Sequence, residues 1–315
     1  NWLRMEQCYF LGLDKGVDLG YAGQCHFVAN WSQGTNIAYN LTRGASFAYF
    51  ERCMNLSGGS FIYASDPAGD GYSNGVTVNM CHSVWASATD IHFDGWQAVF
   101  INQGGFDLGL RKQGLEMDSN AAVYLRNCQD IRVTNCWLAS WLGDAAGDPV
   151  LNKQRIGLHL KETHSGIVSG NSFVNNYIGV KVEGYDPNVE PWPAFGGKTI
   201  NNALAVVGNK FQANTYYHIY LGDYSRTVSI TQNTFQTNPR KSDDDRVHCE
   251  IYAETNGTDY NIIKDNMFAG PEYTIECGAN SIVKDNIWNI GEDCFLSLIY
   301  DMYNKPGVPD TPMGQ

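Results

Sequence analysis

Three carboxylates follow short segments in which polar and apolar residues alternate. Glu183 ends the segment IGVKVE, Asp223 follows HIYLG, and Glu254 ends CEIYAE. Glycoside cleavage uses two carboxyl groups, about 5 Å apart for retention and about 6.5–9.5 Å apart for inversion. If these segments are parallel strands about 4.8 Å apart, Glu183 and Glu254 lie about 9.6 Å apart, with the strand of Asp223 between them. The pattern predicts an acid–base pair of Glu183 with Glu254 or Asp223.

The same segments, and the earlier segments AAVYLRN and IGLHLK, carry aromatic and charged side chains at positions that alternate with the apolar ones. Aromatic rings offer flat apolar faces to sugar rings, and their polar edges can form hydrogen bonds. A merely solvated face would more often carry Ser, Thr and Lys, so the mixture indicates a binding groove. The predicted substrate-binding residues are Tyr124, Arg126, His159, Lys161, Lys181, Tyr220, Glu250 and Tyr252 on the strands and Trp192 in a long loop. We expect no metal ion or cofactor at this face.

A second chemistry fits part of this set. Tyr124, Arg126, His159, Lys161 and Lys181 supply the cation and the proton carriers that β-elimination on a uronic-acid polymer requires. A polysaccharide lyase therefore remains an alternative to the hydrolase. A third alternative is a fibre that binds glycan without cleaving it.

These segments belong to a repeat that dominates the chain. An apolar strand, an Asn, one spacer and a bulky aromatic recur six times, with the Asn at 135, 171, 209, 233, 266 and 286. Cys8 and Cys53 occupy the Asn position in fainter upstream copies. Repetition at 20–40 residues is typical of a solenoid, in which each unit packs only on its neighbours. We expect the Asn to tolerate left-handed backbone angles at a corner and to bond to the Asn of the next unit.

Around each Asn the apolar residues alternate with period two, and a second short strand follows the aromatic. The pattern predicts an all-β fold, a single-stranded parallel β-helix with loop insertions. We assign residues 1–290 to the β-helix domain, of which the first 115 or so are less regular, and residues 291–315 to a C-terminal cap or tail. The chain opens directly in strand-like sequence, so we expect a further N-terminal portion of unknown role.

Composition and net charge restrict the classes of molecule that the chain is expected to bind. The net charge of −12 is a poor match for nucleic acid, which calls for a basic stripe, and leaves carbohydrate as the natural partner. No apolar run is long enough to cross a membrane. Nine cysteines without a CxxC pair indicate reduced, structural thiols and folding in a reducing cytoplasm.

The Asn-x-aromatic phrase and the strand after it resemble the right-handed parallel β-helix enzymes of the pectin-lyase-like superfamily, most of all the bacteriophage tailspikes that depolymerise bacterial surface polysaccharides. The resemblance covers residues 115 to 290 well. It implies a homotrimer on a phage tail that acts outside the cell, on a capsular, O-antigen or exopolysaccharide whose sugars and linkage the sequence does not specify. The calcium signature of the pectate lyases is absent.

Overall fold

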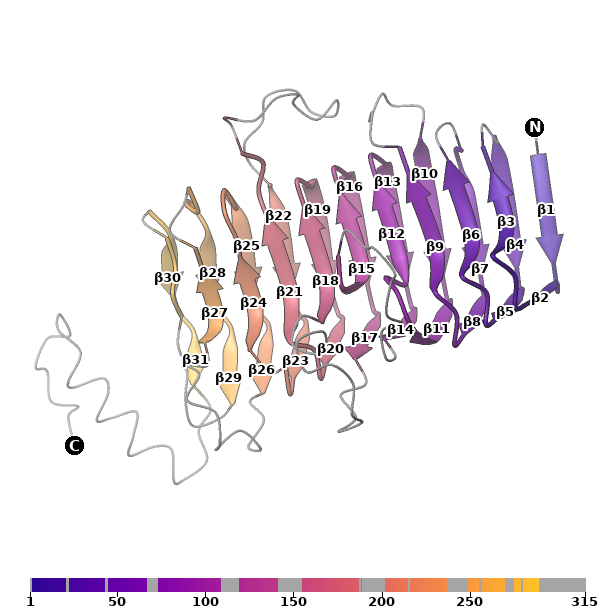
Figure 1. The fold of residues 1–315 in the computed structure, drawn as a ribbon. Coiled ribbons are helices and arrows are strands. Elements are labelled where there is room, and N and C mark those ends of the chain that lie inside the picture. Colours follow the sequence, from indigo (N-terminus) through magenta and orange to yellow (C-terminus); the bar gives the residue numbers. More distant parts are fainter. Residues whose placement is uncertain are drawn as a thin grey trace, which may run out of the picture.

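The chain folds into a stack of coils along one axis, with the two ends of the stack far apart (Figure 1). Each of the first nine coils contributes one strand to each of three parallel sheets, and the last two contribute to the first and second sheets, so neighbours in a sheet come from consecutive coils. This is the predicted right-handed parallel β-helix, and the described residues contain no helix. The structure, a computed structural model, describes residues 2–288 apart from 21–22, 43–44, 67–72, 109–118, 141–154, 187, 189–201, 215, 237–248, 255–256, 270–274 and 279.

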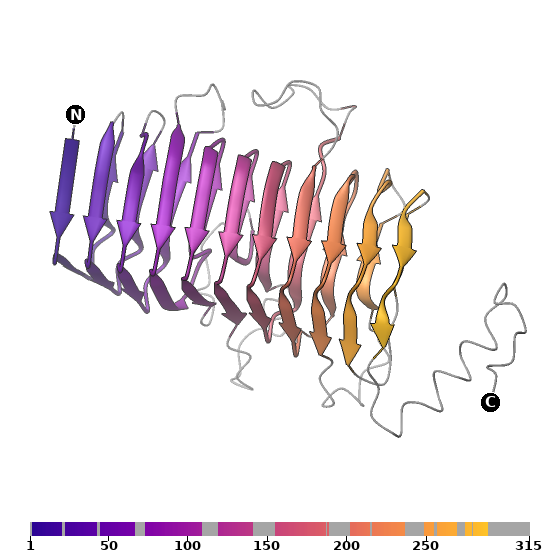
Figure 2. The same ribbon diagram turned by 180° about the vertical axis from the view of Figure 1, so that it is seen from behind.

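The first and second sheets each have eleven strands, and the third has nine. Figure 2 shows from behind how strands of successive coils lie side by side along the stack. The first sheet consists of β1 (Trp2–Glu6), β4 (Gln24–Val28), β7 (Ala48–Glu51), β10 (Asn74–Asn79), β13 (Gln97–Asn102), β16 (Gln129–Thr134), β19 (His164–Ser169), β22 (Leu204–Val207), β25 (Val228–Thr231), β28 (Ile262–Lys264) and β30 (Ile282–Lys284). The second consists of β2 (Tyr9–Leu11), β5 (Trp31–Gln33), β8 (Met54–Leu56), β11 (His82–Ala86), β14 (Gly105–Leu108), β17 (Trp137–Ser140), β20 (Ser172–Val174), β23 (Lys210–Gln212), β26 (Thr234–Gln236), β29 (Met267–Ala269) and β31 (Ile287–Trp288). The third consists of β3 (Lys15–Leu19), β6 (Ile37–Thr42), β9 (Ser60–Ser65), β12 (Ile91–Asp94), β15 (Ala121–Arg126), β18 (Ile156–Lys161), β21 (Ile178–Glu183), β24 (Tyr217–Leu221) and β27 (Cys249–Ala253).

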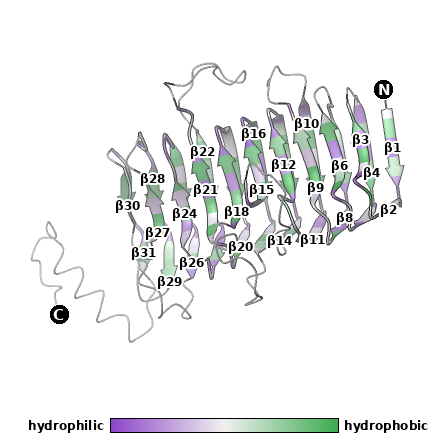
Figure 3. Cartoon of the chain, viewed as in Figure 1, coloured by the Kyte–Doolittle hydropathy of each residue, from purple (hydrophilic) through white to green (hydrophobic). Residues whose placement is uncertain are grey.

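Alternating apolar residues of all three sheets point into the stack and form one continuous core. Figure 3 shows hydrophobic and hydrophilic positions interspersed along the strands. Phe173, Phe211 and Phe235 stack face to face, with ring centroids 4.9 Å apart at each step. All three are fully buried, as the phase of the repeat predicts. The aromatic residues of these phrases therefore support the wall that carries the outer side chains.

The repeated asparagines form a hydrogen-bonded ladder at the corner between the first and second sheets. The Nδ2 of Asn171 donates to Oδ1 of Asn209 over 3.0 Å, and the same 3.0 Å bond joins Asn209 to Asn233 and Asn233 to Asn266. Each Oδ1 also accepts a backbone N–H from the preceding coil. The predicted bonding is confirmed, but the left-handed angle belongs to the residue before each Asn, such as Gly170.

The predicted register is wrong in one coil. Trp137 pairs with Ser172, so Cys136, not Asn135, occupies the ladder position, and its backbone N–H donates to Asn171. Asn135 instead takes the left-handed corner angle. Trp137 consequently faces outward and is 49% exposed. Cys also occupies this position in three earlier coils, where Cys8, Cys53 and Cys81 stand directly before β2, β8 and β11, whereas Asn30 and Gly104 stand before β5 and β14.

The first 108 residues form four complete coils and two strands of the fifth, with the same pairing as the later coils. The seven cysteines whose side chains are described are free, in accord with the predicted reduced thiols. No helix of the described residues is long and apolar enough to span a membrane. The predicted tail, 291–315, lies outside the described residues.

Candidate functional site

The candidate site is the outer face of the third sheet, on β15, β18, β21, β24 and β27. One outward column runs Tyr124, His159, Lys181, Tyr220 and Tyr252, each paired with the next in the ladder. This confirms the predicted alignment. The β-helix thus converts positions 22 to 39 residues apart in sequence into steps of about 4.8 Å.

A second outward column lies two residues further along each strand. Arg126 pairs with Lys161, and Lys161 pairs with Glu183. The next two coils contribute Gly222 and Glu254, which directly follow the paired residues at the ends of β24 and β27. Glu183 and Glu254 therefore share one column and lie two coils apart, as predicted, with a residue that has no side chain between them.

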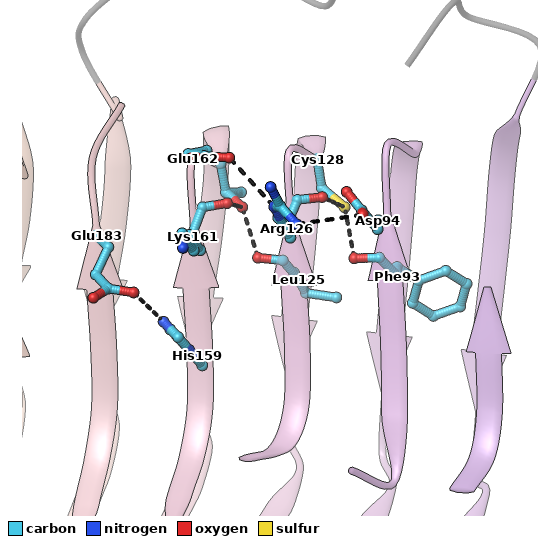
Figure 4. Close-up of polar contacts among 10 residues, drawn as sticks. Phe93, Asp94, Leu125, Arg126, Cys128, His159, Lys161, Glu162 and Glu183 are labelled. Carbon is cyan, nitrogen blue, oxygen red and sulfur yellow. Dashed lines mark hydrogen bonds and ion pairs between the residues drawn. The ribbon is translucent and has the colours of Figure 1, made fainter. Parts of the chain in front are cut away.

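The carboxylate of Glu183 is held from two sides. His159 Nε2 donates to Oε2 over 2.6 Å, and Lys181 Nζ lies 2.7 Å from Oε1. Figure 4 shows His159 and Glu183 reaching toward each other from neighbouring strands. Ser119, just before β15, lies 2.8 Å from the other ring nitrogen of His159, Nδ1. These contacts place four side chains in one connected network.

The network fixes the ionisation of its members. Burial acts to raise the pKa of Glu183, but the contacts with His159 and Lys181 outweigh it and lower the pKa to about 2. Burial lowers the pKa of His159, against the opposing effect of Glu183. At neutral pH the site therefore holds an ionised carboxylate beside a neutral imidazole.

Glu254 has a different environment. The hydroxyl of Tyr220 donates to Glu254 Oε1 over 2.5 Å, and burial together with this bond raises the pKa of Tyr220. The Tyr220 ring stacks on Tyr252 with centroids 5.7 Å apart, and Lys181 Nζ lies 5.5 Å from the Tyr220 centroid. Half-buried aromatic faces therefore lie directly beside the second carboxylate.

The space between the two carboxylates is bounded closely. A Cβ at Gly222 would lie 3.0 Å from Glu183 Cγ and 3.1 Å from Tyr220 Cε1. Asp223 follows Gly222 and is exposed, and its backbone carbonyl accepts the N–H of Gly184 over 2.9 Å. The third predicted carboxylate is thus next to the end of the Glu183 strand.

On the N-terminal side, a cation lies between two carboxylates. Arg126 Nε lies 3.5 Å from Glu162 Oε2, and Arg126 Nη1 lies 3.9 Å from Asp94 Oδ2 (Figure 4). Burial acts to lower the pKa of Arg126, but the two carboxylates outweigh it and raise the pKa. The Arg126 guanidinium is therefore fully charged and already compensated.

The prediction that Glu250 binds substrate on the outer face is wrong. Glu250 and His218 are 4% and 3% exposed, and His218 Nε2 lies 2.8 Å from Glu250 Oε2. Their column faces the core, since a Cβ at the equivalent Gly179 would lie 2.9 Å from the Phe211 ring. The ladder pairs skip this position, so two successive residues point inward and strict alternation fails at the start of these strands.

Two of the predicted residues, Tyr124 and Trp192, remain to be placed. Tyr124 lies in the outward column but is buried, between the rings of His92 and His159. Sequence reasoning missed His92, which pairs with Tyr124 and extends the column. The signal was present in IHFD, whose alternation matches the other third-sheet strands. Trp192 lies outside the described residues.

Where the chain is described, no three His, Cys, Asp or Glu side chains are grouped so that they could hold a metal ion.

No protein family model matches the chain, and no curated protein sequence matches it. Solved structures with a similar fold include a mutant of the periplasmic alginate epimerase AlgG, with 8% identity and a TM-score of 0.45 over 91% of this chain and 73% of that chain. A tailspike protein mutant of E. coli bacteriophage HK620 in complex with a pentasaccharide has 13% identity and a TM-score of 0.44, over 86% and 54% of the two chains. An alginate lyase from Paenibacillus sp. has 9% identity and a TM-score of 0.36, over 88% and 99%. Identities this low relate the chains by fold and not by chemistry.

Proposed function

We propose that this chain is a depolymerase that cleaves a bacterial surface polysaccharide by carboxylate-based glycoside hydrolysis. The observation that carries the proposal is the column in which Glu183 and Glu254 flank Gly222, a residue without a side chain. Two coils separate the carboxylates by about 9.6 Å along the stack, near the upper end of the range of about 6.5–9.5 Å for inversion. Because Gly222 has no side chain, nothing at its own position comes between the two carboxylates, and the scissile bond would lie on the outer side of this column.

The two carboxylates suit different roles. Glu183, held ionised by Lys181 and His159, is suited to activate water as the general base. Among the described residues, the side-chain hydrogen bond found for Glu254 comes from the neutral phenol of Tyr220. A general acid must lie beside the bound sugar, and Glu254 lies next to the Tyr220 ring on which a sugar would stack. Asp223 is the alternative acid.

The substrate would be held by stacking and by hydrogen bonds. Tyr220 and Tyr252 present neighbouring half-buried rings on consecutive coils. Lys161 and Lys181 offer donors to sugar hydroxyls on the adjacent strands. An extended polysaccharide lying along the stack would cross these side chains in turn.

One observation favours a lyase as the second candidate. Lys181 lies over the Tyr220 ring, so a cation and a phenol that can move a proton are in contact. We rank it second because Glu183 already compensates the charge of Lys181, and because the chain's net charge of −12 opposes binding of a polyanionic uronic acid polymer.

Product analysis separates the candidates. The chain is incubated with purified capsular, O-antigen and exopolysaccharides, and reducing ends and ultraviolet absorption are followed together. New reducing ends without the absorption of a conjugated unsaturated uronate support hydrolysis. Both signals together indicate elimination. Binding without either signal would leave a glycan-binding fibre and refute the depolymerase.

We further propose that the chain acts as a homotrimer on a phage tail, outside the cell. The resemblance of the coil phrase to tailspikes supports this. So do large apolar side chains on the outside of the first coils, among them Trp2, Leu11 and Trp31.

A further inference from the structure

A serine, a histidine and a carboxylate are joined in a line across three consecutive coils. Ser119 Oγ lies 2.8 Å from His159 Nδ1, and His159 Nε2 lies 2.6 Å from Glu183 Oε2. Lys181 anchors the far oxygen of Glu183 over 2.7 Å. Glycoside hydrolysis by Glu183 and Glu254 gives Ser119 no role.

We propose that Ser119, His159 and Glu183 form a nucleophile–base–acid triad that hydrolyses small acyl esters, such as O-acetyl groups, on the sugar hydroxyls of a bound glycan. The activity is distinct from cleavage of the glycosidic bond. Ester hydrolysis itself does not depend on the depolymerase function. Only the choice of a sugar as the alcohol rests on it.

The hydrogen-bond directions meet the requirements of such a triad. The neutral tautomer of His159 with its proton on Nε2 donates to Glu183 and leaves Nδ1 free to accept from the Ser119 hydroxyl. Burial lowers the pKa of His159, so the ring is neutral and able to take a proton. The pKa of Glu183 is about 2, so its carboxylate is ionised at neutral pH and stabilises the imidazolium that forms.

The nucleophile is also held in place. The carbonyl of Ser119 accepts a hydrogen bond from Thr89 Oγ1 over 2.7 Å. Ser119 is 9% exposed and His159 is 5% exposed, which restricts the acyl group to a small one. Lys181 and Tyr220 continue the outward column from His159, so a glycan that extends along this column from Tyr220 toward Tyr124 would reach the coil of Ser119.

The reaction balances without a co-reactant other than water. Ser119 Oγ attacks the acyl carbonyl as its proton passes to His159 Nδ1, forming the Oγ–C bond. The C–O bond to the sugar then breaks, and the sugar oxygen takes the proton from His159. Water, activated by the same imidazole, hydrolyses the acyl-serine, releases the carboxylic acid and restores the hydroxyl of Ser119.

The test uses the purified full chain with a fluorophosphonate probe and, separately, p-nitrophenyl acetate. We expect the probe to label Ser119, located by peptide mass spectrometry. We expect S119A and H159Q each to lower ester hydrolysis by about 10²-fold or more. The matched control is S140A, since Ser140 is a buried serine whose hydroxyl donates to Asn176 and not to an imidazole. It should retain labelling and ester hydrolysis.

Labelling of the unaltered chain decides the matter even if a variant fails to fold. A chain that is not labelled at Ser119, or whose ester hydrolysis equals that of S119A, overturns the proposal and leaves Ser119 as a residue that only positions His159. A reducing-end assay on the same samples separates the two activities. Polymer cleavage without labelling refutes the triad alone, and labelling without polymer cleavage refutes the depolymerase alone.

Discussion

His159 Nε2 donates to Glu183 Oε2 over 2.6 Å, joining residues that are 24 positions apart in sequence and one coil apart in space. With Lys181 on the other oxygen, the carboxylate has a fixed orientation and a fixed charge. A surface carboxylate on a strand would have neither. Glu183 is therefore the central residue of the site. Its contacts with His159 and Lys181 determine the reactions in which it can take part.

The first prediction concerns the pH dependence of stability. The pKa of Glu183 is about 2 in the folded chain, against 4.5 for the free group. A carboxyl group whose folded pKa is lowered adds stability above the unfolded pKa and loses it as pH falls through the folded pKa. Between about pH 5 and pH 2, the free energy of unfolding of the unaltered chain should fall by up to about 3 kcal/mol. Glu183→Gln already lacks this contribution at pH 5, so its free energy of unfolding should change less over the same range. Urea unfolding across this range measures the difference. Asp223→Asn, which removes an exposed carboxylate, is the control, and equal pH dependence of all three proteins would contradict the ion pairs.

The second prediction concerns the gap between the carboxylates. Gly222→Ala places a methyl group 3.0 Å from Glu183 Cγ and 3.1 Å from Tyr220 Cε1, so both side chains must shift by a few tenths of an ångström. We expect turnover to fall by about 10-fold or more, because the shift displaces Glu183 and the Tyr220 partner of Glu254 from their positions. Reducing-end formation and thermal melting are measured on the same preparation. Unchanged turnover would show that the reacting bond lies elsewhere.

The third prediction concerns the buried pair His218 and Glu250. Glu250→Ala leaves His218 Nε2 buried without its acceptor and should destabilise the chain by about 1–3 kcal/mol. Glu250→Gln keeps an acceptor oxygen and should cost less. Neither variant should alter glycan affinity per folded molecule. If Glu250→Gln lost glycan affinity while its melting temperature stayed the same, Glu250 would contribute to glycan binding, contrary to its buried position.

The fourth prediction concerns assembly. Light scattering at micromolar protein should give three times the chain mass of 35.0 kDa. Trp31→Ser, which removes a large exposed apolar side chain from the second sheet, should weaken the association if that sheet faces a partner copy. A mass equal to one chain would refute the trimer.

The phase of the sequence repeat was sufficient to predict the wall and the outward column. Because side chains on a strand alternate and parallel coils align, the phrase placed Lys181, Tyr220 and Tyr252 in one row and Glu183 and Glu254 in another. The stacked Phe173 and Phe211 confirm the same phase inside. Periodic packing leaves few other registers, since a shift of one residue would expose the core.

Departures from strict periodicity were not predictable in this way. Glu250 turns inward because two successive residues of the strand face the core, which simple alternation does not indicate. Asn135 matched the phrase by residue type but lies one position out of register, with Cys136 on the ladder. Ser119 precedes its strand and carries no repeat signal, so only the three-dimensional contact with His159 reveals it.

The central claim is that Glu254 and Glu183 together cleave a glycosidic bond, and the rate of reducing-end formation by Glu254→Gln tests it most directly. The amide keeps the shape and an acceptor for the Tyr220 hydroxyl, so folding and glycan binding should be nearly unchanged. We predict that turnover falls by about 10² or more, as it should for Glu183→Gln. Asp223→Asn, assayed alongside, shows whether Asp223 supplies the acid instead. Cleavage at the rate of the unaltered chain by all three variants would contradict the account.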